Sequence, residues 1–399
     1  MDDYYDNEKN WLFPEVNKEP LDDMSEAEGF LASEFEKAKE KPVVINFSCG
    51  KDSLACLALA TKVLRRMNDK RRPIILTSIT GYEQNDFAPW FDYLKSVLFS
   101  RYDWLCVKPT EFTSYIVETV GLGKPPVNMP NMKQCNGRWK DYPLHLGKKI
   151  LEEKYGEYLS VTGVRAEESF RRRSRLEVTG RVGDISGHIF YQPLAWITTK
   201  TLWAWLEENL EEYTGVSFDR LKDYYANKGR DGCWLCSYHY DWSDLTPFQR
   251  WVQEFQAAVW DEATKTNLFS IHKREPGEKK HTAVWLTPYV THACRSDIEK
   301  RREWLDKILE ADRKFGEGFV KQIHLDFIYE HWNYQERYKD DYGRYAAMNH
   351  WNHYKEDYLP NMLKPYLYDI AFTHKVTGNG KKIDYIRKGY VEFFNDTKN

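Results

Sequence analysis

Residues Val43 to Ala60 read VVINFSCGKDSLACLALA, and this stretch decides the fold. The apolar, β-branched run Val43–Phe47 predicts a strand, and the periodicity of Ser53–Met67 predicts an amphipathic helix. Six residues, Ser48-Cys49-Gly50-Lys51-Asp52-Ser53, join the two elements directly. Because the first N–H groups of a helix have no partner within the helix and carry partial positive charge, such a turn predicts an anion site.

The residue types in the turn indicate which anion it would hold. Gly50 lets the backbone approach a ligand closely, Ser48 and Ser53 carry hydroxyl donors, and Lys51 carries a point charge. A phosphate or pyrophosphate is therefore the predicted guest. The spacing is not that of a Walker A loop, G-x-x-x-x-G-K-[ST]. The alternative is a plain strand–turn–helix connection whose charged side chains face water.

Short β-rich runs alternate with helical patterns from Val43 to Gly163. This alternation predicts an α/β fold with a doubly wound, mostly parallel, Rossmann-like sheet. Residues 1–40 form a polar arm, whose predicted helix Ser25–Lys39 has Ser25 and Glu28 in capping-box spacing. Residues 41–240 would be the nucleotide domain, and residues 241–399 a helical, aromatic-rich C-terminal domain. The predicted strands and helices of the nucleotide domain are 43–47, 53–67, 74–79, 87–99, 104–107, 144–154 and 159–163.

The composition excludes several classes of protein. The net charge of -3 excludes a strongly basic nucleic-acid coat, and no run is apolar and long enough to predict a membrane span. The N-terminus lacks the basic and apolar regions of a signal peptide, so we expect a cytosolic protein without a membrane partner. Seven cysteines in such a chain favour metal binding or redox chemistry over a disulfide framework.

The segment FSCGKDS resembles the PP-loop, S-G-G-K-D-S, of the ATP pyrophosphatase and phosphoadenosine-phosphosulfate (PAPS) reductase superfamily, with Cys49 in place of the first glycine. Further motifs follow in the order of that superfamily, over about residues 40 to 240. They are CNGRWKDYPL from Cys135, GVRAEESFRRR from Gly163, YQPLAWITTKTLWAWL from Tyr191 and GRDGCWLC from Gly229. The resemblance implies an adenine-nucleotide α-hydrolase-like fold that binds ATP, PAPS or adenylyl sulfate.

Arg165 follows the predicted strand 159–163, and ligands of open α/β sheets bind at the carboxyl ends of strands. The resemblance implies that Arg165 and Arg172 contact the phosphates or the acceptor, with Glu168 orienting an arginine. The alternative is a solvated run of charges. The expected nucleotide-binding residues are Ser48, Cys49, Gly50, Lys51, Asp52, Ser53, Gly163, Arg165, Glu168 and Arg172.

Cys233 and Cys236 form a C-x-x-C pair after Gly232, and such a turn can place two thiolates on one metal ion. The alternative is a pair of buried, apolar cysteines. Cys56 and Cys106 lie in apolar patterns, which predicts core positions.

Two more cysteines are candidate ligands. The segment at Cys135 resembles the CC-G-x-R-K-x-x-P-L segment of cluster-bearing adenylyl-sulfate reductases, with Asn136 in place of the second cysteine. Cys294 would supply a fourth thiolate, and His239, His281 and His292 are alternatives to it. Four thiolates favour a [4Fe–4S] cluster, with zinc as the second choice.

The Lys-Asp-Ser ending of the loop resembles the branch that cleaves ATP between the α- and β-phosphates and releases pyrophosphate. With cysteines suited to a cluster, the chain resembles the sulfur-transfer members of that branch, such as the proteins of DNA phosphorothioation and the tRNA-thiolating enzymes. This resemblance implies a sulfur donor or reductant protein as a partner. Lys51 and Mg²⁺ would offset charge on the leaving group, Asp52 would help to hold Mg²⁺, and Cys135 or the cluster would deliver sulfur. The expected catalytic residues are Lys51, Asp52, Cys135 and Arg165.

Two other functions stay open. One is a PAPS or adenylyl-sulfate reductase that forms sulfite, for which Cys294 is the candidate nucleophile. The other is a regulator that binds nucleotide without turnover. Aromatic and basic residues alternate in the C-terminal third, which suits either a nucleic-acid backbone or a helical protein partner.

Overall fold

The computed structural model describes residues 23–121, 123, 136–185, 188–226, 232–236, 244–264, 298–337 and 389–395. These residues divide between two compact units, each formed from separate stretches of the chain. Unit 1 comprises the described residues of Met1–Asn46, Lys51–Pro73 and Glu157–Phe218. Unit 2 comprises those of Phe47–Gly50, Ile74–Gly156 and Asp219–Asn399.

Unit 1 contains four strands in the order β5-β6-β4-β1. β4 pairs in parallel with both β1 and β6, and β5 pairs with β6 as an antiparallel hairpin. Val43, Val44 and Ile45 are all buried, as expected for a parallel strand that is covered on both faces. The strands are β1 (Val43–Asn46), β4 (Leu159–Thr162), β5 (Val182–Ile185) and β6 (His188–Tyr191).

The long helices of unit 1 pack around α2, which is almost wholly buried and contacts both α1 and α6. Thr198 begins α6, since its side chain accepts a hydrogen bond from the N–H of Thr201, and Gly215 ends it in a left-handed conformation. The helices are α1 (Ser25–Lys37), α2 (Lys51–Arg66), the 3₁₀ turn Ala166–Glu168, α5 (Phe170–Thr179) and α6 (Thr199–Thr214).

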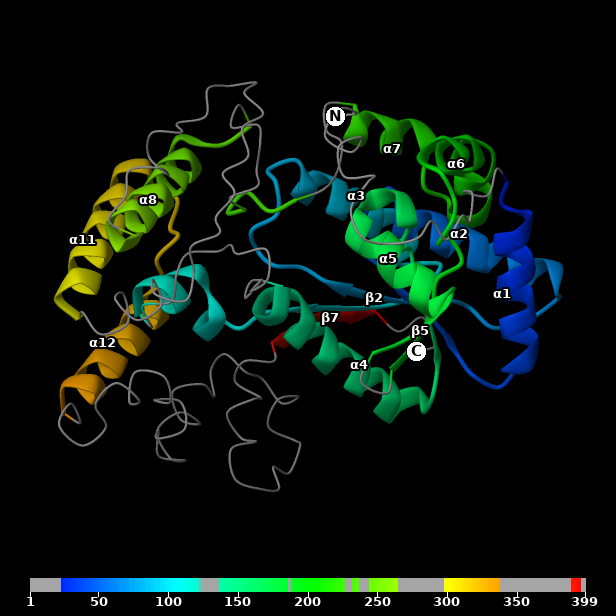
Figure 1. Cartoon of the computed structure of the whole chain (residues 1–399), viewed down its shortest axis with the longest axis horizontal. Coiled ribbons are helices and arrows are strands. Elements are labelled where there is room, and N and C mark those ends of the chain that lie inside the picture. The colour runs from blue at the N-terminus through cyan, green and yellow to red at the C-terminus, as the bar shows by residue number, and fades with distance from the viewer. Residues whose placement is uncertain are drawn as a thin grey trace. The chain divides into compact units, whose positions relative to one another are not determined.

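Unit 2 contains β2 (Ile74–Ser78), β3 (Asp103–Lys108) and β7 (Tyr390–Asn395). β2 and β3 are parallel, whereas β7 comes from the end of the chain and is antiparallel to β3 (Figure 1). Helix α4 (Tyr142–Tyr155) packs on β2 and β3 at Gly147. A Cβ atom at Gly147 would lie 2.6 Å from Cδ1 of Leu76, so the glycine sets this close approach.

The other helices of unit 2 surround a second apolar core. Helices α8 and α11 lie side by side (Figure 1), and α11 and α12 both contact a buried π-helical turn, Ile116–Gly121. The core is rich in aromatic side chains, among them Trp304 and Trp332. The elements are α3 (Phe87–Leu98), the 3₁₀ turn Glu111–Thr113, the π-helical turns Ile116–Gly121 and Asn136–Asp141, α7 (Phe218–Tyr225), α8 (Pro247–Thr264), α11 (Ile298–Phe315) and α12 (Gln322–Arg337).

These elements confirm the predicted α/β class, with mostly parallel strands, flanking helices and a helical C-terminal region. The domain boundaries at residues 40 and 240 stay predictions. No helix among the described residues is long and apolar enough to cross a membrane. The hairpin β5–β6 and strand β7 were not predicted, because their short sequences carry no clear alternation of apolar and polar residues.

The predicted capping box of α1 is wrong. Met24 is the N-cap and makes no side-chain cap, and the Ser25 hydroxyl donates to Asp23 Oδ1 at 2.5 Å. Glu28 instead forms ion pairs with Lys62 and Arg66 of α2. The tertiary ion pairs therefore replace the local cap.

Candidate functional site

The second residue of the loop Ser48–Ser53 has a left-handed backbone conformation. Cys49 has φ = 65°, a conformation that glycine adopts easily and other residues rarely do. Its side chain is only 1% exposed, and Nε1 of Trp90 donates a hydrogen bond to its carbonyl oxygen at 2.8 Å. The cysteine thus keeps the backbone conformation that a glycine would favour at this position.

Lys51 and Asp52 open helix α2. Nζ of Lys51 lies 3.1 Å from Oδ2 of Asp52, and the Lys51 side chain is largely buried. An acidic residue in the first turn also interacts favourably with the positive end of the helix dipole. A lysine and a carboxylate are therefore held together at the N-terminus of the most buried helix of unit 1.

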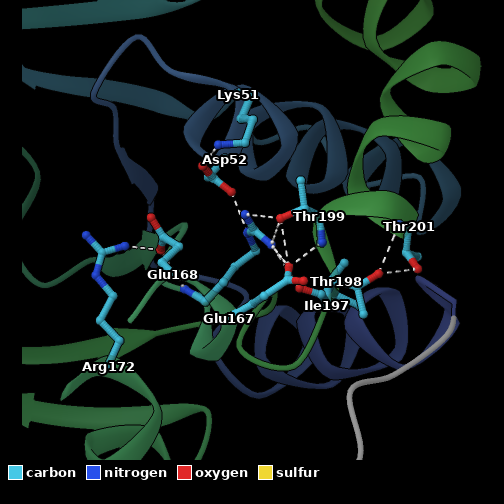
Figure 2. Close-up of polar contacts among 10 residues, drawn as sticks. Lys51, Asp52, Glu167, Glu168, Arg172, Ile197, Thr198, Thr199 and Thr201 are labelled. Atoms are coloured by element: carbon cyan, nitrogen blue, oxygen red, sulfur yellow. Dashed lines mark hydrogen bonds and ion pairs between the residues drawn. The ribbon is translucent and has the colours of Figure 1, made fainter. Parts of the chain in front are cut away.

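Arg165, just beyond the end of β4, ties this helix to two other segments. Its partners Asp52, Glu167 and Thr199 are labelled in Figure 2. Its side chain is 2% exposed, and its Nε donates to Asp52 Oδ1 at 2.5 Å. Nη1 donates to Glu167 Oε2 at 3.0 Å and to the carbonyl oxygen of Ile197 at 3.1 Å, and both Nη atoms donate to Thr199 Oγ1 at 3.2 Å. The guanidinium group therefore fixes Asp52 relative to the end of β4 and the start of α6.

Glu167 completes this network. Its Oε2 accepts hydrogen bonds from the N–H of Thr199 at 2.5 Å and from the Thr199 hydroxyl at 2.7 Å. Burial by itself raises the pKa of Glu167, but the hydrogen bonds from Thr199 and the charge of Arg165 outweigh it, so the pKa is lowered. The carboxylate is thus held in its charged form opposite the guanidinium group.

Gly163 allows β4 to end directly against the start of α2. A Cβ atom at this position would lie 2.8 Å from both the carbonyl carbon and the carbonyl oxygen of Asp52. Real Cβ atoms essentially never come so close, so any other residue would push the two segments apart. The glycine of the predicted motif therefore has a steric role beside Asp52.

Glu168 and Arg172 lie beside this network. Oε2 of Glu168 accepts a hydrogen bond from the backbone N–H of Arg165 at 3.1 Å and forms an ion pair with Arg172. Ser169 caps α5 by accepting a hydrogen bond from the N–H of Arg172 at 3.3 Å. The structure thus brings together, within unit 1, the predicted residues Lys51, Asp52, Gly163, Arg165, Glu168 and Arg172.

Residues 42–237 match the model of the phosphoadenosine phosphosulfate reductase domain family. The chain carries a PAPS reductase domain. The members of this family are enzymes that bind adenine nucleotides such as PAPS. The domain therefore has a sulfonucleotide-related enzymatic role. None of the curated proteins matches the chain.

The C-x-x-C pair of the PAPS reductase domain forms a tight turn in unit 2. The N–H of Cys236 donates to the carbonyl oxygen of Cys233 at 2.9 Å, and Cys233 forms an antiparallel bridge with Glu83. Burial raises the pKa of the Cys233 thiol well above its ordinary value, and the neighbouring Cys236 raises it further. Two thiols three positions apart in one turn fit a soft metal ion. A bound metal ion would stabilise the thiolate forms that burial disfavours.

The aromatic ring of Tyr82 joins two of the predicted motifs. The rings of Trp139 and Trp234 lie 4.7 Å and 6.1 Å from it, centroid to centroid, and Phe319 lies at 6.3 Å. Trp139 belongs to the motif that starts at Cys135, and Trp234 lies within the C-x-x-C turn. The two cysteine-bearing motifs therefore pack on the same side chain.

The other predicted ligands lie outside the described residues. They are Cys135 and Cys294, together with the alternatives His239, His281 and His292. Across the described part of the chain, no group of three or more metal-binding side chains is present. Cys56 and Cys106 are buried, which confirms their predicted core positions.

Sequence reasoning missed several residues of the two sites. Glu167 lies inside a predicted motif, where its charge was the available signal, but its partner Thr199 lies 32 residues further along the chain. Tyr82 had no local signal, because a single tyrosine in a loop is common. Two glutamines of α8, Gln253 and Gln256, also had no local signal, although both contact the cysteine turn.

Proposed function

We propose that the PAPS reductase domain binds ATP or a related adenine nucleotide at residues 48–53 and cleaves it at the α-phosphate. The observation that carries this proposal is the convergence of Lys51 and Arg165 on the two oxygens of Asp52, at the N-terminus of α2. Lys51 and the positive end of helix α2 then lie together in unit 1 and favour an anionic ligand, while Arg165 holds the Asp52 carboxylate beside them.

The reaction would transfer an adenylyl group. An acceptor atom forms a bond to the α-phosphorus, the bond from that phosphorus to the bridging oxygen breaks, and pyrophosphate leaves with the electron pair. Lys51 would offset the growing charge on the pyrophosphate, together with the N–H groups of the loop. Arg165 would act as a positioning residue, since its donors are engaged with Asp52, Glu167, Ile197 and Thr199.

Asp52 fits the role of a Mg²⁺ ligand. Magnesium in nucleotide sites is held by one or two carboxylates and by the phosphates of the substrate. The Asp52 carboxylate is partly exposed and fixed in orientation by Arg165. Bound Mg²⁺ would supply charge neutralisation at the transferring phosphate.

The cysteines support a second part of the proposal, an iron–sulfur centre that serves sulfur transfer. Cys233 and Cys236 would be two ligands, with Cys135 and Cys294 as the others, and zinc is the second choice of metal. The packing of Trp139 and Trp234 on Tyr82 supports a shared site, because Trp139 lies four residues after Cys135 in the sequence and Trp234 lies between Cys233 and Cys236. A bound cluster would supply electrons or sulfur to the reaction. The same proposal includes a nucleic acid as the acceptor. It also includes a nucleic-acid or protein partner bound through residues 241–399, and a sulfur donor or reductant protein.

Nucleotide binding and pyrophosphate release test the first part. We would measure binding of ATP and PAPS by calorimetry, and pyrophosphate release with Mg²⁺, in the full chain and in Lys51→Met and Asp52→Asn. Loss of a charged hydrogen bond predicts about tenfold to a hundredfold weaker binding for Lys51→Met. Lys62→Met is the matched control, since Lys62 lies on the same helix but pairs with Glu28. Equal loss in both lysine variants would contradict a phosphate role for Lys51.

The products separate the alternatives. Pyrophosphate supports adenylyl transfer, whereas sulfite formed from PAPS or adenylyl sulfate identifies a reductase. Tight binding without either product supports a regulator. Each outcome other than pyrophosphate release would overturn the proposed reaction while leaving the nucleotide site in place.

Metal analysis tests the second part. After anaerobic purification we expect about four irons and four acid-labile sulfides per chain, with a visible absorption band, and their loss in Cys236→Ala. Cys106→Ala is the control, because Cys106 is a buried core residue of β3. Zinc alone, or no metal, would rule out the cluster and leave the adenylyl-transfer proposal to be judged by its own assay.

A further inference from the structure

We infer that Gln253 and Gln256 of helix α8 are positioning residues for the Cys233–Cys236 turn. The inference rests on the proposed metal-binding role of the two cysteines. Helix α8 begins at Pro247, beyond residue 237, where the match to the PAPS reductase domain ends. A part of the chain outside that match would therefore complete the cysteine site.

The two amide groups hold three consecutive carbonyl groups of the turn. Nε2 of Gln253 donates to the carbonyl oxygen of Trp234 and, at 3.2 Å, to that of Cys236. Nε2 of Gln256 donates to the carbonyl oxygen of Leu235 at 3.4 Å. Together with the bond from the N–H of Cys236 to Cys233, these contacts fix the path of the backbone from one cysteine to the other.

The opposite side of the turn is held by the loop that follows β2. The N–H of Trp234 donates to the carbonyl oxygen of Tyr82 at 2.9 Å, and the N–H of Gly232 donates to the side chain of Gln84 at 3.2 Å. The turn is thus bonded from two directions, through its N–H groups by the loop and through its carbonyl groups by α8.

The burial of the two glutamines indicates that they serve to bind the carbonyl groups of the turn. Gln253 and Gln256 are 5% and 4% exposed, among buried apolar residues of the same helix such as Val252 and Phe255. A buried amide group destabilises the fold when one of its polar atoms is left without a hydrogen bond. Oε1 of Gln256 has no partner among the described residues, so an apolar side chain would suit the core better. The donors of both amides nevertheless point to the turn.

A third buried glutamine on the same face provides a matched control. Gln249 precedes Gln253 by one helical turn, but its amide pairs with that of Asn85, at 2.8 Å and 3.0 Å, and not with the cysteine turn. Removal of its amide should therefore disturb the helix and its packing to a similar extent without changing the path of the backbone between Cys233 and Cys236.

The consequence for metal binding follows from preorganisation. Four-coordinate metal ions and clusters require thiolates at fixed distances and directions, and the partners that orient the ligands commonly alter metal affinity tenfold to a hundredfold. A turn that is free to rearrange would lose a bound metal faster. It would also expose its thiols more often.

The experiment uses the full chain with Gln253→Met, Gln256→Met and the control Gln249→Met, each of similar side-chain volume to glutamine. Two rates are measured: release of bound metal to a chelator, and alkylation of Cys233 and Cys236 in the metal-free, reduced protein, followed by peptide mass spectrometry. For Gln253→Met, which loses two hydrogen bonds, we expect both rates to rise about tenfold. A smaller rise is expected for Gln256→Met, and less than a twofold change for Gln249→Met.

The two readouts separate this inference from the proposed function. If the wild-type chain binds no metal, the metal-binding proposal fails, and the alkylation rates still decide whether α8 orients the turn. Equal rates in Gln253→Met and Gln249→Met would overturn the inference even when metal is bound. If Gln253→Met does not fold, Gln256→Met provides the same comparison, with the thermal midpoint of each variant measured in parallel.

Discussion

Nε of Arg165 lies 2.5 Å from Oδ1 of Asp52, a residue 113 positions earlier in the chain. The arginine side chain is buried, and its guanidinium group also contacts Glu167 and the segment Ile197–Thr199 at the start of α6. The pair therefore sets the orientation of the carboxylate at the start of α2, next to Lys51.

Replacement of Arg165 should destabilise the chain strongly. Arg165→Met leaves Glu167 without its cation and Asp52 paired with Lys51 alone. Removal of one partner of a buried ion pair typically lowers the free energy of unfolding by about 3–5 kcal/mol. Arg165→Lys should recover only part of this loss, because lysine cannot reproduce the fork of donors. Urea unfolding measures the effect, with the exposed Arg171→Ala as control. Equal stability of Arg165→Met and Arg171→Ala would show that the network contributes nothing.

Gly163→Ala should separate β4 from α2. The added methyl group would meet the Asp52 backbone at 2.8 Å, and overpacking of this kind lowers the free energy of unfolding by about 1–3 kcal/mol. Nucleotide affinity should fall as well, because Asp52 and Lys51 would shift. Gly29→Ala in α1 is the control, since no atom lies within 4 Å of its Cβ position and alanine favours a helix interior. We expect Gly29→Ala to be neutral or stabilising.

The loop should need the conformation of Cys49 and not its thiol. Cys49→Gly should keep the fold and nucleotide binding, because glycine adopts φ = 65° without strain. Cys49→Val should lower the free energy of unfolding by about 2 kcal/mol, since a branched side chain is disfavoured in the left-handed region. Thermal unfolding and calorimetry with ATP compare the two variants. Loss of nucleotide binding in Cys49→Gly would instead assign a direct role to the thiol.

Glu111 should make the stability of unit 2 depend on pH. Its burial favours a higher pKa, but hydrogen bonds from His324 and Lys321 and their charges lower the pKa to about 2. A carboxylate with a lower pKa in the folded state stabilises the protein above the pKa of the unfolded chain. That contribution is lost as pH falls through the interval from about 4.5 to about 2.

Urea unfolding at pH 7, 5 and 3 tests this assignment. Glu111→Gln should lower the free energy of unfolding at pH 7 by roughly 1–3 kcal/mol, and the difference from wild type should shrink at pH 3. Glu299→Gln, at an exposed position of α11, should show no such pH-dependent difference. If the free energies of unfolding of wild type and Glu111→Gln differ by the same amount at all three pH values, the assignment of the pH dependence to Glu111 is wrong.

Local patterns were sufficient for the main elements of the nucleotide domain. The run from Val43 predicted β1 and α2 within two residues of their ends, because a buried strand followed by a buried helix leaves a strong apolar pattern. The predicted capping box at Ser25 failed, since Glu28 pairs with another helix. Strand β7 was missed because its pairing partner, β3, lies almost 300 residues earlier, and the segment alone does not show that it belongs in a sheet.

The sequence by itself determined the strand–turn–helix loop, the family and the candidate residues, because each of these depends on residue types at short spacing. Only the tertiary structure decided which partners those residues have. Arg165 is engaged by Asp52, Glu167 and Thr199, and the cysteine turn is held by Tyr82 and by Gln253. The physical reason is that a hydrogen bond depends on distance and direction in space, and the chain brings these atoms together only when its strands and helices have packed.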